Sequence, residues 1–338
     1  MISLYRTPLL LRPSGSPFVR ATLVALILSL TGILSSCGAS PTSTTQGGGS
    51  ASGASPETAA GTTDAGYPLT LTDDAGREVT IDGEPENIAS MAPSITETLF
   101  AVGAGDRVVG VTTSDDYPEE VTDIETVGDF SEINVEQVLA LDTDLLFVSF
   151  DTTAERADEL EEQTDADVVV VDPGTLDEVL ESVELVGRAA GEPQNGRRTQ
   201  EEMRSELDAI ESAVAGEPEP TVFYEVFGDP LQTVGPGSFI DDAIGVAGGE
   251  NIAAGTGEAY PTYSAETVIE RDPDFYLVGS FSGTDAETVA ERPGFSNLSA
   301  VEGDRVKVID DDLISRPGPR VADGVRQIAQ ALHPNADL

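Results

Sequence analysis

The clearest pattern of apolar and polar positions lies between residues 88 and 111, which read IASMAPSITETLFAVGAGDRVVGV. Ile95, Leu99 and Val102 are spaced i, i+4 and i+7, so they form one apolar stripe on a helix. Apolar runs flank the stripe on both sides. The pattern therefore predicts a strand, a tight loop, a helix and a second strand.

The start and the stop of this helix are marked by particular residues. Ser94 and Glu97 fit an S-x-x-E capping box, which predicts that Ser94 is the N-cap. Gly103 and Gly105 can take the positive φ that ends a helix. Pro93 stands where a loop leaves a strand for a helix, and in open α/β sheets this edge faces the ligand.

Related patterns return later in the chain. The stretch from Ser238 to Ile252 repeats the one that begins at Ser94, at an offset of 238 − 94 = 144 residues. Asn134 to Val148 and Ser264 to Val278 share a capping residue, a helical turn, D-x-D and an apolar strand, at an offset of 264 − 134 = 130. Two similar offsets predict one α/β unit used twice, and hence two lobes with a cleft between them.

Other short apolar runs complete the two predicted sheets. A hairpin is predicted over Leu69–Ile81, because two alternating runs flank an Asp-Asp-Ala-Gly turn. Strands that alternate with helical patterns favour parallel sheets. The predicted strands are Glu125–Val127, Leu145–Ser149, Val168–Val171, Thr221–Tyr224, Leu231–Val234, Phe275–Gly279 and Arg305–Ile309, and the predicted helices outside the repeats are Leu176–Ala190, Gln194–Ala215 and Arg320–Leu332.

The helix predicted over Gln194–Ala215 joins the two lobes. Met203, Leu207, Ile210 and Val214 keep one apolar stripe along it. A helix of about 20 residues is about 30 Å long and stiff. The predicted fold class is therefore α/β, with two lobes that each hold a mainly parallel sheet flanked by helices, joined by a long rigid α-helix.

The N-terminal region predicts export. Residues 1–36 read as a signal peptide, with arginines before an apolar core from Ala21 to Leu34. Cys37 follows Leu34-Ser35-Ser36, which resembles the lipobox of secreted lipoproteins, where the cysteine carries the lipid; the alternative is a generic signal peptide with an incidental cysteine. The polar, Gly-rich residues 37–66 predict a lipid-anchored flexible tether outside the cytoplasm. The predicted domains then follow as residues 67–188, the connecting helix 189–217, and residues 218–338.

The composition narrows the function without naming it. The 17 Lys and Arg against 62 Asp and Glu give a net charge of −45, which repels nucleic acid. A halophilic source explains this acidity, because salt screens the self-repulsion; an acidic protein of ordinary origin is the alternative. With one Cys and one His, the chain offers no internal disulfide, zinc cluster or His-based triad.

An enzyme and a metal-ion-binding lipoprotein are the remote alternatives. The sequence contains no G-x-S-x-G, H-E-x-x-H or P-loop motif, and paired carboxylates mean little among 62 acids. We therefore predict neither catalysis nor a bound cofactor. A metal-ion carrier normally uses His ligands, and only His333 is present.

Several short motifs follow one another in a fixed order along the chain. They are Ala92-Pro93-Ser94-Ile95-Thr96-Glu97, residues 103–112, Asp116-Tyr117-Pro118, Val127-Gly128, Asp142-Thr143-Asp144-Leu145, Gly248-Gly249-Glu250-Asn251 and Arg316-Pro317-Gly318-Pro319-Arg320. Together, over about residues 86–334, they resemble the substrate-binding proteins of ABC importers for vitamin B12 and iron–siderophore complexes.

The resemblance implies the class III binding-protein fold, little hinge motion and a ligand between the lobes. It also implies a monomer that delivers its ligand to a membrane permease and its ATPase subunits. One acid of each lobe, here Glu97 and Glu250, would dock on permease arginines. The chain departs from the family pattern at Thr143, where a proline is usual, and it contains no Trp, which B12 binders of the family often place against the ligand.

The residues that follow the predicted strands are the candidate ligand-binding residues. A corrin or haem needs apolar faces with a few polar contacts, which Tyr supplies, whereas an anionic ferric siderophore needs several cations. Only Arg316, with Arg320 nearby, offers positive charge, so we predict cobalamin over a ferric siderophore or haem. The candidates are Pro93, Ser94, Tyr117, Phe130, Phe150, Tyr224, Phe227, Tyr260, Tyr263, Phe281 and Arg316.

Overall fold

The structure is a computed structural model that describes residues 66–129, 132–149 and 152–338. The predicted signal peptide and Cys37 lie outside the described residues, as does all of the tether except Gly66. Phe130 and Phe150, two of the candidate ligand-binding residues, also lie outside them.

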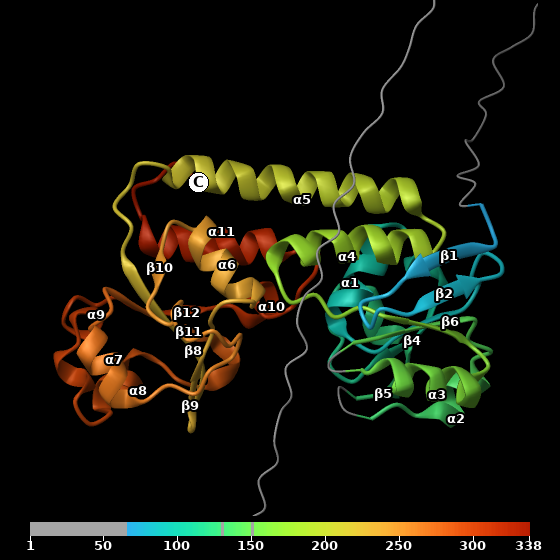
Figure 1. Cartoon of the computed structure of the whole chain (residues 1–338), viewed down its shortest axis with the longest axis horizontal. Helices are drawn as coiled ribbons and strands as arrows, with labels where there is room; N and C mark the ends of the chain where they lie inside the picture. Colours follow the sequence, from blue (N-terminus) through green and yellow to red (C-terminus); the bar gives the residue numbers. More distant parts are fainter. Residues whose placement is uncertain (1–65, 130–131, 150–151) are drawn as a thin grey trace, which may run out of the picture. The chain divides into compact units, whose positions relative to one another are not determined.

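The first half contains the predicted hairpin and a five-stranded parallel sheet in the order β5-β4-β3-β6-β7 (Figure 1). Parallel neighbours need a crossover between them, and helices provide it. The hairpin is β1 (Leu69–Thr72) and β2 (Glu78–Ile81), and the sheet is β3 (Ile88–Ser90), β4 (Val108–Thr112), β5 (Glu125–Gly128), β6 (Leu145–Val148) and β7 (Asp167–Val170). The helical segments are α1 (Pro93–Ala101), η1 (Gly105–Arg107), η2 (Glu119–Asp123), α2 (Val135–Ala140) and α3 (Ala154–Thr164).

The second half contains a separate sheet in the order β10-β8-β11-β12, which is parallel, with β9 added antiparallel to β8. Its strands are β8 (Thr221–Gly228), β9 (Leu231–Thr233), β10 (Glu250–Asn251), β11 (Phe275–Gly279) and β12 (Val306–Ile309). Its helical segments are α6 (Phe239–Val246), α7 (Ala265–Arg271), η3 (Ser280–Ser282), α8 (Ala286–Glu291), η4 (Phe295–Asn297), α9 (Ser299–Glu302), α10 (Asp311–Ile314) and α11 (Val321–Leu332).

The predicted internal repeat is present, with one copy in each sheet. Asn134 caps α2 and Ser264 caps α7, each by accepting a hydrogen bond from the amide three residues on. Asp142 and Asp272, the first acids of the two D-x-D sequences, both take the left-handed backbone conformation, with φ of 48° and 44°. The strands that follow, β6 and β11, lie inside different sheets. The predicted fold class is therefore confirmed.

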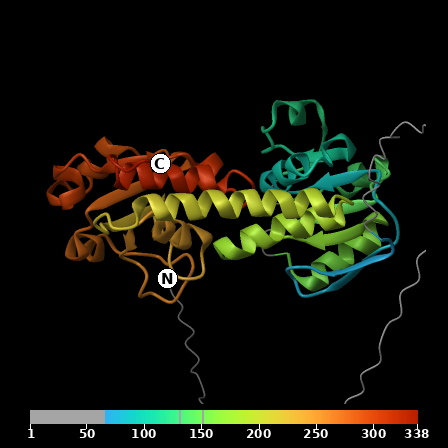
Figure 2. The same cartoon turned by 90° about the horizontal axis from the view of Figure 1, so that it is seen from above.

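Helices α4 (Leu176–Ala189) and α5 (Pro193–Val214) link the two sheets along the chain. Helix α5 packs on α4 and on α11, and Figure 2 shows it running beside elements of both halves. Its predicted stripe of Met203, Leu207, Ile210 and Val214 is buried. The connecting helix is thus held along its length by apolar contacts.

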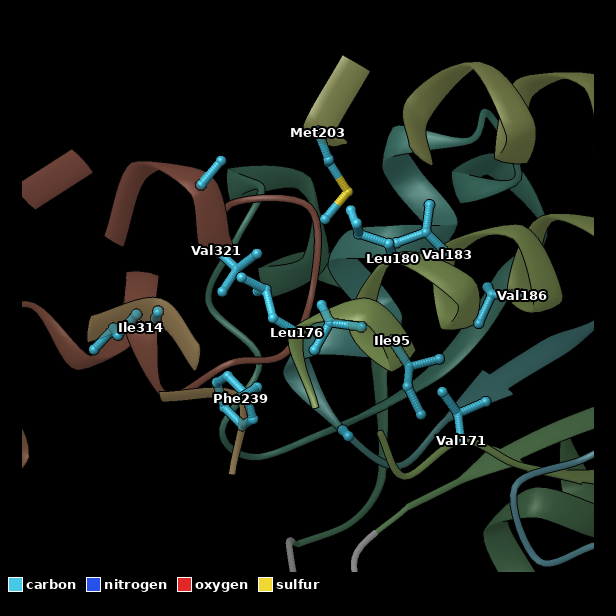
Figure 3. Packing of buried hydrophobic residues seen from close by; sticks show 14 of the residues in the cluster. Ile95, Val171, Leu176, Leu180, Val183, Val186, Met203, Phe239, Ile314 and Val321 are labelled. Carbon is cyan, nitrogen blue, oxygen red and sulfur yellow. The ribbon is translucent and has the colours of Figure 1, made fainter. Parts of the chain in front are cut away.

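The largest apolar core reaches from the first sheet to the second. It contains Ile95 of α1, Leu176 of α4, Phe239 of α6 and Ile314 of α10, and all four are buried (Figure 3). Buried apolar area stabilises by about 25 cal/mol per Å² removed from water. A core shared in this way opposes a hinge between α1 and α6, as the family resemblance implies.

Two details of the predicted helix start and stop are wrong. Helix α1 begins two residues early, with Ala92 as the N-cap, Pro93 at the first turn and no side-chain cap. Proline fits the first helical position because it needs no amide donor there. Gly103 takes the predicted positive φ of 88°, but Gly105 does not; a Cβ at Gly105 would lie 2.6 Å from the Phe100 ring, so the requirement there is space.

The described residues from Gly66 to Leu338 belong to one compact unit, so the boundaries predicted at residues 188 and 218 stay predictions. Among the described residues, no helix combines the length and the apolar character that a membrane span requires.

Candidate functional site

The loop after β4 carries the first candidate aromatic, Tyr117. Asp115 shapes this loop, because its Oδ2 accepts hydrogen bonds from the Thr112 amide at 2.9 Å and the Thr112 hydroxyl at 2.6 Å. The turn places Asp116 and Tyr117 beyond the carboxyl end of the strand. The Tyr117 side chain is 48% exposed.

The segment Ser315–Arg320, which we call the arginine segment, lies between α10 and α11 and packs on the start of α1. A Cβ at Gly318 would lie 3.0 Å from the Ser94 carbonyl oxygen and 3.4 Å from its Cα, so only glycine fits this approach without a shift. Pro93 and Ser94 are buried at this contact. In this arrangement the two residues support the arginine segment, and the prediction that they line the cleft remains untested.

The two arginines of the segment meet three carboxylates. Arg316 Nη1 donates to Glu97 Oε1 at 3.0 Å and to Asp116 Oδ1 at 2.7 Å, while its Nη2 lies 2.5 Å from Asp312 Oδ1. Arg320 Nε and Nη2 donate to the two oxygens of Glu97 at 2.8 and 2.6 Å. Both guanidinium charges are thereby balanced, and the cluster of two cations and three anions carries a net charge of −1.

The pKa values of Asp116, Arg316 and Arg320 shift in the direction that keeps these three groups ionised, whereas that of Asp312 shifts the other way. The hydrogen bond from Arg316 lowers the pKa of Asp116. The hydrogen bonds to Glu97 raise the pKa of Arg320. Burial lowers the pKa of Arg316, but the hydrogen bonds to Asp116 and Glu97 outweigh it and raise the pKa overall. Burial raises the pKa of Asp312, against the opposing effect of Arg316.

Four of the candidate aromatics expose their rings. Within the described parts of the chain, seven large hydrophobic side chains are exposed, and these four are among them. They come from both halves: Tyr117, Tyr260 and Phe281 follow β4, β10 and β11, and Phe227 lies in the last residues of β8. The exposed fractions are 48% for Tyr117, 60% for Phe227, 45% for Tyr260 and 68% for Phe281.

Two other candidate aromatics are buried in the second half. Tyr224 is 1% exposed and its hydroxyl donates to Asp311 Oδ1 at 3.4 Å; burial raises its pKa well above the usual value. Tyr263 packs against Phe223, and its hydroxyl donates to the Ile252 carbonyl at 3.2 Å. Both residues are buried in this structure, so they form part of the core of the second half, and their predicted contact with a ligand stays a prediction.

Asp311 accepts hydrogen bonds both from the buried Tyr224 and from the backbone of the exposed Phe281. It is buried, and its carboxylate accepts hydrogen bonds from the Phe281 amide and the Ser315 hydroxyl, both at 2.6 Å, in addition to Tyr224. Gly279 allows this approach, because a Cβ there would lie 2.5 Å from the carboxylate. The turn that carries Phe281 is therefore fixed from below by one buried acid.

The two predicted docking acids differ in their surroundings. Glu97 is 4% exposed and both of its oxygens are bonded to arginines, so its carboxylate is not free for a partner in this structure. Glu250 is exposed at the start of β10, and its amide donates to the Pro220 carbonyl at 2.9 Å. His333, the single histidine, is the C-cap of α11, and its Nε2 lies 3.2 Å from the Gly248 carbonyl oxygen.

A separate cavity of about 360 Å³ lies at the opposite edge of the first sheet, near the amino ends of β6 and β7. Its lining includes six carboxylates, those of Asp82, Glu84, Glu86, Asp144, Asp165 and Asp167. Across the described ranges, no group of three or more His, Cys, Asp or Glu side chains is arranged to hold a metal ion.

The sequence did not identify Asp116, Asp311, Asp312 and Arg320 as candidate site residues. Asp116 and Arg320 stand within the motifs that carry the resemblance, and that position was the available signal. Asp311 and Asp312 belong to an acidic run that reads like the rest of a highly acidic surface. Only the burial of Asp311 and the bonding partners of both acids, seen in the structure, distinguish them from the other acidic residues.

Comparisons with known proteins agree with this architecture. The chain is 34% identical over 276 residues to the uncharacterized ABC transporter substrate-binding lipoprotein YvrC of Bacillus subtilis, covering 80% of this chain and 87% of the relative. It is 31% identical over 283 residues to a cobalamin-binding protein of Halobacterium salinarum, covering 79% of this chain and 74% of that protein.

A solved structure with the same fold is the periplasmic heme-binding protein RhuT from Roseiflexus sp. RS-1 in apo form. The TM-score is 0.66 at 27% identity, and the match covers 74% of this chain and 98% of RhuT. The family model described as periplasmic binding protein matches residues 88–313, which is more than half of the chain. The chain therefore belongs to the periplasmic binding protein family, as a substrate-binding protein of an ABC transporter.

Proposed function

We propose that this protein captures cobalamin outside the cytoplasm and delivers it to the permease of an ABC importer. Residues 67–188 and 218–338 act as its two lobes, and residues 189–217 act as the connector. The predicted lipid on Cys37 would tether it to the membrane. The cobalamin-binding relative from Halobacterium salinarum supports this ligand at 31% identity.

One observation supports the ligand class most strongly: four candidate aromatic residues are exposed, and one of them, Tyr117, lies beside an arginine whose charge is already balanced. Tyr117, Phe227, Tyr260 and Phe281 offer ring faces and two hydroxyls. A corrin ring suits such a surface, because its large apolar faces replace water there. An anionic siderophore would need Arg316 or Arg320 to leave a carboxylate, at the cost of charge-assisted hydrogen bonds.

Docking on the permease is proposed for Glu250 and Glu97. Glu250 is exposed and can pair with a partner cation directly. Glu97 would have to exchange its bonds to Arg316 and Arg320 for bonds to an arginine of the partner. Docking through Glu97 therefore requires the loss of existing hydrogen bonds, whereas docking through Glu250 does not.

The test is a calorimetric titration of the purified full-length chain in high salt with cyanocobalamin, haem and several ferric siderophores. We expect cyanocobalamin to bind most tightly. The matched variants are Phe227→Ala and Phe281→Ala, which remove exposed rings, with Leu139→Ala as a control at an exposed residue outside the candidate set. Cyanocobalamin binding should weaken about tenfold in each ring variant, as for loss of a good aromatic contact, and stay unchanged in the control.

Haem is the second candidate, because RhuT is a heme-binding protein with the same fold. Haem presents two propionates, which would compete with Glu97 and Asp116 for the arginines. Tighter binding of haem than of cyanocobalamin, together with loss of haem affinity in Arg316→Met, would replace our proposal with this one.

A further inference from the structure

Arg320 contacts both a carboxylate and an aromatic ring of the first half. Its guanidinium carbon is 4.1 Å from the centroid of the Tyr117 ring. Its Nε and Nη2 donate to the two oxygens of Glu97. Two parallel bonds to one carboxylate fix the position and the plane of a guanidinium more firmly than one bond would. Glu97 therefore determines where this cation stands against the ring.

The surroundings of Tyr117 make that cation important. The side chain is 48% exposed, so the protein covers only part of the ring. A guanidinium within about 6 Å of a ring centroid attracts the ring face, and more strongly where water is excluded. The Arg320 side chain is only 21% exposed and Glu97 is buried, so this contact is partly shielded from solvent.

The neighbouring pair strengthens the same arrangement. Arg316 Nη1 bonds both to Glu97 and to Asp116, the residue before Tyr117. Arg316 thus holds the loop through Asp116, and Arg320 holds it through the Tyr117 ring. Both arginines share Glu97, which makes this acid the common support.

We propose that Arg320 is a positioning residue for ligand binding: held by Glu97, it fixes the Tyr117 ring at the ligand-facing surface. This rests on the proposed function only in taking Tyr117 as a ligand contact. Neither Arg320 nor Glu97 needs to touch the ligand. A partner cation that takes Glu97 from Arg320 would free the ring, so docking and ligand release would be linked through one acid.

The first test needs no ligand. The chain has no Trp, so Tyr117→Trp introduces a single indole whose quenching by acrylamide reports the covering of that ring position. In this background, Arg320→Met and Glu97→Gln should each raise the quenching constant about twofold, because the cation over the ring is lost or released. Arg326→Met is the matched control, since Arg326 lies on α11 and pairs with Asp323 and Glu206.

A second probe separates a local effect from general loosening. Tyr260→Trp reports on an aromatic of similar exposure, 45%, that is not in the Arg320 contact. Arg320→Met should leave its quenching unchanged. If Arg320→Met lowers the yield or the melting temperature, Arg320→Lys replaces it. A lysine keeps the charge but cannot make two parallel hydrogen bonds to one carboxylate, so quenching at position 117 should still rise. Unchanged quenching at position 117 in a folded Arg320 variant overturns the proposal.

The ligand arm is a double-mutant cycle with cyanocobalamin. Arg320→Met and Tyr117→Ala should each weaken binding about fivefold, and the double variant should be no weaker than Tyr117→Ala alone, because both act through one contact. Additive losses overturn the positioning role. If the wild-type chain binds no cobalamin, the proposed ligand fails, while the quenching experiment still decides the role of Arg320.

Discussion

Helices α1 and α6 begin with the same sequence signal, a serine followed three residues later by an acid, yet the two starts are built differently. In α6, Ser238 is the N-cap and its hydroxyl accepts from the Asp241 amide at 3.1 Å. Asp241 in turn accepts a hydrogen bond from Asn251 of the same half. In α1, Ala92 is the N-cap and Glu97 bonds to arginines more than 200 residues away.

The difference has two physical causes. Pro93 is suited to the first helical position, so α1 starts early and Ser94 falls inside the first turn, where its hydroxyl has no cap to make. Glu97 is then free of the N-terminus and meets two guanidinium groups, whose charged hydrogen bonds are stronger than a neutral cap. A local signal thus predicts that a helix starts, but a distant partner decides what its acid does.

The largest expected effect is on stability at Glu97. Glu97→Ala removes the shared acid and leaves two partly buried arginines to each other and to Asp116 and Asp312, so we expect a loss of about 3 kcal/mol in the free energy of unfolding. Asp241→Ala is the matched change in α6 and should cost about 1 kcal/mol. Urea unfolding at fixed salt measures both. Equal losses would contradict the contrast between the two acids.

Reversing the exposed acid tests the docking side of the same contrast. Glu250→Arg should leave cyanocobalamin affinity unchanged and lower uptake by cells at least tenfold, because like charges at an interface repel. Glu97→Arg should lower both affinity and uptake, since it also breaks the arginine cluster. Uptake of radiolabelled cobalamin is compared with calorimetric affinity for each variant. Wild-type uptake by Glu250→Arg would remove Glu250 from the docking proposal.

The two serines give a smaller effect. Ser238→Ala loses an N-cap and should destabilise by about 1 kcal/mol. Ser94→Ala removes a hydroxyl that caps nothing and should change stability by no more than about 0.5 kcal/mol. Thermal and urea unfolding of the pair measure this directly. A cost at Ser94 equal to that at Ser238 would restore the capping box that the sequence predicts.

Features with a local signal were predictable from the sequence. The repeat at Asn134 and Ser264 has its capping residues and its strands at the predicted places, because each depends on neighbours within a few residues. The long helix α5 was predictable from its apolar period for the same reason.

The site was predictable only in part. The candidate aromatics were chosen because they follow predicted strands. This rule selected both the exposed Phe281 and the buried Tyr224. It cannot separate them, because burial depends on the elements packed above the sheet edge. The pairing of Glu97 with Arg316 spans 219 residues and had no local signal among 62 acids. Long-range electrostatics therefore set the limit of the sequence interpretation.

The smallest expected effect is the pH dependence of stability. It distinguishes the start of α1, which charged groups contact, from the start of α6, which a neutral serine caps. Arg316 lowers the pKa of Asp116 in the folded chain, so the unfolded chain binds more protons. The stability from this pair is therefore present above the ordinary Asp range near 3.8 and is lost as the pH falls through the lowered pKa. Asp116→Asn should be less stable than wild type from pH 7 to about 5, by less than about 1 kcal/mol, because the Asp116 side chain is 60% exposed.

As the pH falls below about 4 the difference between the wild type and Asp116→Asn should shrink, and it should vanish only below the lowered pKa of Asp116, where protonation removes the same charge that the substitution removes. Urea midpoints from pH 7 to pH 3 measure the difference. Repeating the series in 1 M salt should shrink it, since screening weakens an exposed pair. Ser238→Ala should show a loss that is independent of salt, because its cap involves no charge. A salt-insensitive gap for Asp116→Asn would mean that packing, and not charge, holds the arginine segment on α1.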